Sequence, residues 1–126
     1  MILADTSVWI DHFRTGSASF ARQLEAGKIA THLVVVGELA TGNLLRRQET
    51  LAALRRLPRV KAGTSDECFA YLETHRLFGL GIGWNDVQLL VAAQLSRAQL
   101  WSLDRPLALT AKKLGLLFGK RGVASI

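Results

Sequence analysis

Cysteine, proline and long apolar runs are all scarce in this 126-residue chain. The single cysteine, Cys68, cannot form an internal disulfide, and it has no Cys or His partner at the spacing of a zinc site. Apolar runs such as 33–36 and 114–118 fall well short of the roughly 18 residues that a membrane-spanning helix needs. The first residues hold an acid, Asp5, and no basic leader, which argues against a secretory signal. We therefore expect a soluble, cytoplasmic protein that does not enter a membrane.

Acidic residues are the minority charge. Sixteen Lys and Arg against ten Asp and Glu give a net charge of +6, which attracts polyanions, most commonly nucleic acid. If four of the acids, Asp5, Glu38, Asp86 and Asp104, lie together, the rest of the chain keeps six acids against the sixteen bases. A basic body around an acidic pocket is the charge distribution of a nuclease, which must attract phosphates and also hold cations.

The composition is that of an ordinary globular protein, with a hydrophobic fraction of 49% and a charged fraction of 21%. A chain of this length can bury a core without disulfides or a structural metal. No internal repeat, low-complexity tract or linker interrupts it. The sequence therefore predicts a single domain spanning residues 1–126.

Short apolar runs alternate with segments of helical periodicity along the whole chain. The apolar runs predict strands, and the periodic segments, with their Gly and Pro boundaries, predict helices. The predicted strands are 2–4, 29–31, the neighbourhood of Val60 and 99–103, and the predicted helices are 7–14, 19–26, 35–40, 47–57, 65–78, 86–96 and 105–114, with a turn region at Gly79, Gly81 and Gly83. Strands that alternate with helices imply a parallel sheet covered on both faces, which is an α/β sandwich.

Asp5 and Asp104 each follow a predicted strand directly, although about a hundred positions separate them. Ligands of open parallel sheets bind beyond the carboxyl ends of the strands, which is where both acids fall. Glu38 stands in an apolar segment, where an acid is costly to bury unless it is paired or bound to a cation, and Asp86 opens the most apolar helix. Mg²⁺ and Mn²⁺ prefer carboxylate oxygens, and they activate water for phosphodiester hydrolysis.

Each acid also has a purely structural interpretation. Asp5, Asp86 and Asp104 all stand where a carboxylate caps a helix N-terminus, and Glu38 could face solvent from its helix. Taken singly, any of these explanations is sufficient. Capping is compatible with metal binding, however, and four such acids together supply a consistent ligand set.

Four segments resemble, in order and spacing, the motifs of the PIN-domain family, and more narrowly those of VapC-type toxins of bacterial toxin–antitoxin pairs. The segments are Leu3-Ala4-Asp5-Thr6-Ser7-Val8-Trp9-Ile10-Asp11, Val36-Gly37-Glu38-Leu39, Gly83-Trp84-Asn85-Asp86-Val87-Gln88-Leu89-Leu90 and Leu100-Trp101-Ser102-Leu103-Asp104-Arg105. The likeness covers essentially the whole chain, and the ordered set of motifs is far more specific than any single acid.

The resemblance implies a three-layer α/β/α sandwich around a parallel sheet of about five strands. It also implies a Mg²⁺- or Mn²⁺-dependent endoribonuclease that leaves a 5′-phosphate, forms a homodimer and is inhibited by a cognate antitoxin. By motif, the metal-binding acids are Asp5, Glu38, Asp86 and Asp104. Ser102 matches a catalytic hydroxyl position suited to metal-bound water or phosphate, and Ser7 is a weaker candidate of the same kind. Many relatives carry a further polar or acidic residue and then an aromatic after the last acid, where this chain has Pro106 and Leu107.

Two other functions compete with cleavage of RNA. A module of the same fold could hold RNA without cutting it, but four clustered carboxylates would repel phosphate unless a cation joined them. A phosphate-transferring receiver or phosphatase needs a second acid beside Asp5 and a suitably placed lysine, whereas Thr6 and Ser7 stand there. Basic pairs such as Arg55-Arg56 and Lys120-Arg121 could follow RNA phosphates, although most such pairs are solvated helix faces.

Overall fold

A short parallel sheet forms the centre of the protein in a computed structural model that describes residues 1–119, so that Lys120 and Arg121 lie outside the described residues. The strands β1 (Ile2–Ala4), β2 (Ile29–Ala30) and β3 (Gln99–Trp101) pair in the order β2-β1-β3, and both pairings are parallel. All of β1 and β2 is buried, as expected for strands covered on both faces.

The expected sheet of about five strands is wrong, since three strands form within residues 1–119. Single parallel bridges, Thr31 to Arg59 and Leu100 to Leu117, lie beyond the two edges of the sheet. Neither grows into a strand, because the next backbone donor is missing or already used. Pro58 has no N–H with which to extend the first bridge, and the N–H of Leu116 donates to Ala111 at the end of a helix (2.8 Å).

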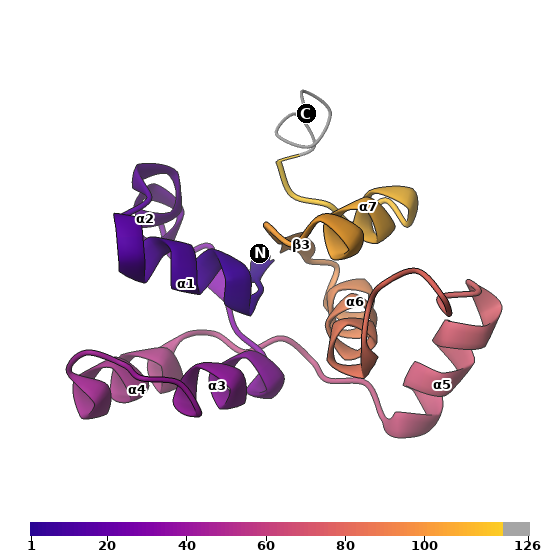
Figure 1. The fold of residues 1–126 in the computed structure, drawn as a ribbon, viewed down its shortest axis with the longest axis horizontal. Helices are drawn as coiled ribbons and strands as arrows, with labels where there is room; N and C mark the ends of the chain where they lie inside the picture. The colour runs from indigo at the N-terminus through magenta and orange to yellow at the C-terminus, as the bar shows by residue number, and fades with distance from the viewer. Residues whose placement is uncertain (120–126) are drawn as a thin grey trace.

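Seven helices cover the sheet within the described part of the chain, which confirms the α/β prediction. Figure 1 shows four of them on the left of the strands and three on the right. The left group is α1 (Thr6–Thr15), α2 (Ala18–Glu25), α3 (Leu33–Ala40) and α4 (Arg47–Arg56), and the right group is α5 (Ser65–Thr74), α6 (Trp84–Ser96) and α7 (Arg105–Lys113). In the order β2-β1-β3, the crossover from β1 to β2 runs in one direction across the sheet, and the crossover from β2 to β3 runs in the opposite direction, past β1. Because parallel crossovers are right-handed, opposite directions place their helices on opposite faces.

Three helix boundaries differ from the prediction by two residues or more. One is the start of α3, at Leu33, and the other two have local backbone causes. The segment predicted as helix over 65–78 ends at Thr74, and Arg76 then takes a left-handed conformation (φ 55°) that stops the helix. At the other end of this loop, α6 begins two residues earlier than predicted, at Trp84, with Gly83 in the extended conformation before it. The earlier start makes Asp86 the third residue of α6 and no longer the first.

Packing around β1 fixes the positions of the helices that follow the strands. Phe20 from α2 is fully buried, and its ring contacts Trp9 of α1 (centroids 4.7 Å apart) and Trp101 of β3 (5.6 Å). On the other side of the sheet, Leu89 and Leu90 of α6 are almost completely buried. None of the helices in the part that the structure describes is long and apolar enough to cross a membrane.

Candidate active site

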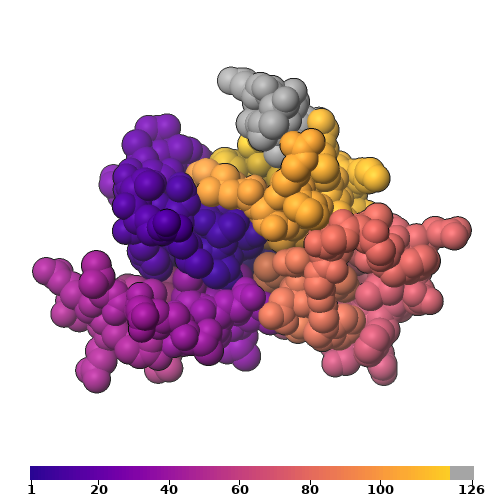
Figure 2. Space-filling model, in the orientation of Figure 1, coloured from indigo at the N-terminus to yellow at the C-terminus, as the bar shows by residue number. Residues whose placement is uncertain are grey.

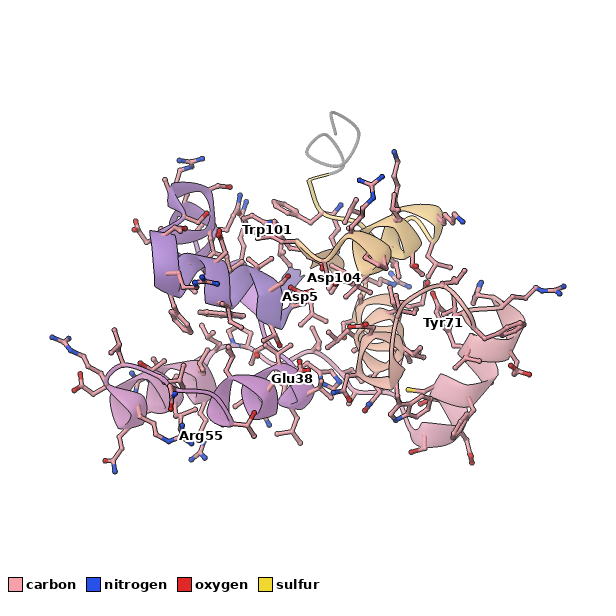
Figure 3. All side chains as sticks on the ribbon, viewed as in Figure 1. Asp5, Glu38, Arg55, Tyr71, Trp101 and Asp104 are labelled. Atoms are coloured by element: carbon pink, nitrogen blue, oxygen red, sulfur yellow. The ribbon has the colours of Figure 1, made fainter. Side chains whose placement is uncertain are left out.

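Four acids from four different elements lie around the carboxyl end of the sheet. Asp5 follows β1 and is the N-cap of α1, Asp104 follows β3 and is the N-cap of α7, and Asp86 is the third residue of α6. Figure 3 shows the labelled Asp5, Asp104 and Glu38 near the centre of the view, and the charge of Asp86 interacts with all three. In Figure 2 this is where the indigo, magenta and orange parts of the surface meet.

The capping interpretation of the three aspartates is also correct. Asp5 Oδ1 accepts from the backbone N–H of Val8 (3.2 Å), Asp104 Oδ2 from that of Leu107 (3.1 Å), and Asp86 Oδ2 from that of Gly83 (3.0 Å). The positive ends of three helix dipoles therefore point at these carboxylates and offset part of their mutual repulsion.

Asp5 is fixed by two serine hydroxyls. Ser7 Oγ donates to Asp5 Oδ1 and Ser102 Oγ donates to Asp5 Oδ2, both at 2.5 Å. Each serine oxygen in turn accepts a backbone N–H from the segment after β3, Ser7 from Leu103 (2.9 Å) and Ser102 from Asp104 (3.0 Å). Both candidate hydroxyls therefore bind Asp5 and, through it, join the ends of β1 and β3.

Glu38 lies on an exposed part of α3, which agrees with the interpretation that it faces solvent from its helix. Val35 and Leu39 lie on the buried side of this helix, whereas Glu38 is exposed to solvent. Its carboxylate is held from both sides. Thr6 Oγ1 donates to Oε1 (2.6 Å), and Asn85 Nδ2 makes a longer contact with Oε2 (3.5 Å). Sequence reasoning missed both residues, although each adjoins a predicted acid.

Burial and mutual charge shift two of the acids. Burial raises the pKa of Asp5, and the charge of Asp86 adds to this, while the hydrogen bonds from Ser102, Ser7 and Val8 act in the opposite direction. Burial also raises the pKa of Asp86, with further contributions from the charges of Asp104 and Glu38 and an opposing one from the Gly83 N–H. These carboxylates therefore hold their protons more tightly than ordinary aspartates, and a nearby cation would reverse that effect.

The chemistry of this donor set fits Mg²⁺ or Mn²⁺, because every candidate ligand atom is a carboxylate oxygen. Across residues 1–119 no three His, Cys, Asp or Glu side chains are close enough together to hold one ion directly. Mg²⁺ does not need such a cage, since it keeps several waters and is commonly held by one or two carboxylates. The residues present are therefore suited to a hydrated cation and unsuited to a structural zinc ion.

Comparisons with known proteins show the family of this chain. A model of the PIN domain matches residues 2–113. Ribonuclease VapC32, from two strains of Mycobacterium tuberculosis, is 35% identical over 117 residues, which are 92% of this chain and 94% of the relative. A toxin–antitoxin complex from Klebsiella pneumoniae has a similar structure, with a TM-score of 0.62 at 25% identity, covering 81% of this chain and 85% of the other.

The fold also matches VapBC2 from Rickettsia felis, a structure bound to a DNA fragment from their promoter. The TM-score is 0.59 at 24% identity, and the match covers 81% of this chain and 86% of the other. At this level of identity the likeness shows the fold alone.

The bond from Thr6 to Glu38 predicts the behaviour of two variants. Thr6→Val keeps the shape of the side chain but removes the hydroxyl, so Glu38 loses its shortest hydrogen bond. We expect Mn²⁺ binding, measured by calorimetry, to weaken by about 10-fold, as is typical when a partner of a metal ligand is removed. Thr6→Ser keeps the hydroxyl and should bind Mn²⁺ like the wild type. Equal affinity of the Thr6→Val variant and the wild type would contradict the role of this bond.

The raised pKa of Asp86 predicts a stability change in the metal-free protein. A carboxylate whose pKa is higher in the folded state stabilises the fold while it is protonated, and that contribution is lost as pH rises through its folded-state pKa. Asp86→Asn should therefore raise the Tm by a few degrees at pH 7 in EDTA. At pH 4 the difference should shrink, because a larger share of the wild-type group is then protonated. A lower Tm of the variant at pH 7, measured by scanning calorimetry, would show that the charge of Asp86 does not oppose folding.

Proposed function

Because the chain belongs to the PIN-domain family, we propose that it is a metal-dependent endoribonuclease that acts as the toxin of a toxin–antitoxin pair. One observation carries the proposal. Three helix N-termini and one exposed glutamate bring four carboxylates to the carboxyl end of the sheet, in an otherwise basic chain. A cation-binding centre inside a surface that attracts phosphate is what hydrolysis of RNA requires.

The side chains divide the work of this site between them. Asp5 is immobilised by Ser7 and Ser102, so it provides a fixed oxygen pair at the base of the site. Among the described residues, Asp86 and Asp104 each use Oδ2 for their backbone hydrogen bond, which leaves Oδ1 of both for a cation or its waters. When bound, Mg²⁺ or Mn²⁺ supplies Lewis-acid chemistry, polarising a phosphoryl oxygen and lowering the pKa of water.

Glu38 is the best-placed residue to accept the proton of the attacking water. It is exposed, so it can reach substrate, and the hydroxyl of Thr6 fixes the direction of its carboxylate. Attack in line with O3′ breaks the bond between phosphorus and O3′, which takes up a proton and leaves as a 3′-hydroxyl, and the product keeps a 5′-phosphate. Simple RNA binding, the alternative function, does not account for this arrangement, because uncompensated carboxylates weaken contact with phosphate.

Loss of one site acid should abolish cleavage without unfolding the chain. We expect Asp104→Asn to reduce RNA cleavage with Mg²⁺ or Mn²⁺ by roughly 100-fold or more, measured on a labelled RNA with mapping of the product ends. Asp5→Asn should do the same. Asp11→Asn is the matched control, because it makes the same charge change on α1 outside the acid cluster. Undiminished cleavage by folded Asp104→Asn protein would refute the assignment.

A groove of about 450 Å³ between α1, α2 and α4 is suited to the antitoxin. Its walls include Leu24 and Leu54, and two buried polar atoms on it, Trp9 Nε1 and His12 Nδ1, have no hydrogen-bond partner among the described residues. Trp9 is 4% exposed, so an unpaired indole N–H there is costly. A peptide that carries apolar side chains and offers an acceptor to this N–H would remove that cost. We assign the groove to the antitoxin, since a similar structure is a toxin–antitoxin complex.

This assignment predicts different effects at two neighbouring alanines of α4. Ala53 lines the groove, and Ala52 is exposed beside it. Ala53→Arg should weaken binding of a candidate antitoxin co-expressed with this chain by about 10-fold or more, because a charged side chain would fill an apolar wall. Ala52→Arg should leave binding unchanged, and both variants should still cleave RNA. Equal binding by the two variants, measured by calorimetry, would place the antitoxin elsewhere.

A further inference from the structure

A second groove begins at the acid cluster and follows the contact between α1 and α3. Its volume is about 240 Å³, and Glu38 forms part of its lining. On α1 it is lined by Ile10, Phe13 and Arg14, which follow Thr6 at the spacing of one helix face. Thr6 is the residue that donates to Glu38. The groove therefore extends from the site along α1. From Thr6 to Phe13 the helix advances by seven residues, which is roughly 10 Å.

The other side of the groove is formed by the end of α3 and the loop after it. Gly42 and Asn43 line it, and Gly42 leaves space there because it has no side chain. A Cβ at Gly42 would meet its nearest atom at 3.6 Å, so the space is open to a larger side chain. Arg47 donates to the backbone carbonyls of Ala40 (2.5 Å) and Gly42 (3.2 Å), which holds this segment against α3.

We propose that this α1–α3 groove binds the nucleobase next to the scissile phosphate and thereby sets the sequence preference of cleavage. The proposal rests on the proposed ribonuclease function. The groove is smaller than the roughly 300 Å³ or more of a site for a drug-sized ligand, and this size suits one planar ring system. Unpaired RNA bases are recognised by aromatic stacking and by hydrogen bonds to their edges.

The lining supplies both kinds of contact, together with a positive charge. Phe13 is 42% exposed, so part of its ring is free to stack on a base. The amide of Asn43 offers a donor and an acceptor to a base edge. Arg14 is exposed at the outer end of the groove and can pair with a neighbouring phosphate of the bound strand.

Continuity with the acid cluster favours RNA over a protein segment here. A base in the groove would place its own phosphate beside Glu38, which is both a lining residue and a member of the cluster. The α1–α2–α4 groove, by contrast, has two unpaired polar atoms and does not include any of the four acids.

The first test changes the groove amide without changing its size. Asn43→Asp replaces the amide donor by an acceptor, so the preferred base at one position beside the cut should change. Cleavage sites on random-sequence RNA, read by sequencing, measure this preference for the full-length chain with Mg²⁺. Leu45→Ala is the control from the same loop, because Leu45 is 90% exposed and does not line the groove. An unchanged preference in Asn43→Asp would overturn the proposal, and cleavage by the wild type would show that the ribonuclease function still stands.

The second test fills the groove and does not depend on cleavage. Gly42→Leu should weaken binding of ten-nucleotide homopolymers, measured by fluorescence anisotropy, by about 10-fold for the tightest of the four. Ala52→Leu places the same side chain at an exposed position of α4 and should have no effect. Unchanged RNA binding by Gly42→Leu would overturn the proposal, whether or not it weakens binding of the antitoxin. If the wild type binds RNA but does not cleave it, the ribonuclease function fails while this test still decides the groove.

Discussion

The hydrogen bonds that hold Asp5 are the constraint on which the rest of the site depends. Two serine hydroxyls bind its two oxygens, and each hydroxyl also accepts a backbone N–H from the segment that follows β3. Residues from the two ends of the chain are thereby fixed to one carboxylate. Because a pair of short strands gives little stability by itself, this polar link also helps to set how β1 and β3 meet.

The helices, more than the sheet, determine where the acids lie. Each of the three aspartates accepts a backbone N–H at a helix N-terminus. These hydrogen bonds fix the positions of the three carboxylates in the site. The same dipoles reduce the cost of gathering negative charge around a buried carboxylate. Burial, and to a smaller extent the charges of neighbouring acids, still raises the pKa values of Asp5 and Asp86. Folding without a cation therefore favours the protonated form of these residues, whereas binding of a cation requires the ionised form.

The sequence was sufficient to predict the α/β class and the family. The class follows from the alternation of apolar runs with helical segments, and the family from the order and spacing of the four motifs. The sequence was not sufficient to predict strand number, because that depends on which N–H groups are free: Pro58 lacks one, and Leu116 uses its own at a helix end. The pattern left open whether Glu38 would be buried or exposed, since an apolar segment can turn one residue outward on a helix. The partners of Glu38, Thr6 and Asn85, belong to other elements, and such tertiary contacts leave no periodic signal.

One ring belongs to both grooves, because Phe13 lines the α1–α2–α4 groove and the α1–α3 groove alike. With the occupants that we assign, the antitoxin in one groove and the RNA base in the other would both contact the ring of Phe13. If one occupant displaces the Phe13 ring, the affinity of the other occupant changes, and thermodynamic linkage makes this effect mutual. An antitoxin that loosens RNA in this way must itself be loosened by RNA to the same degree, so abundant transcript would favour release of the toxin.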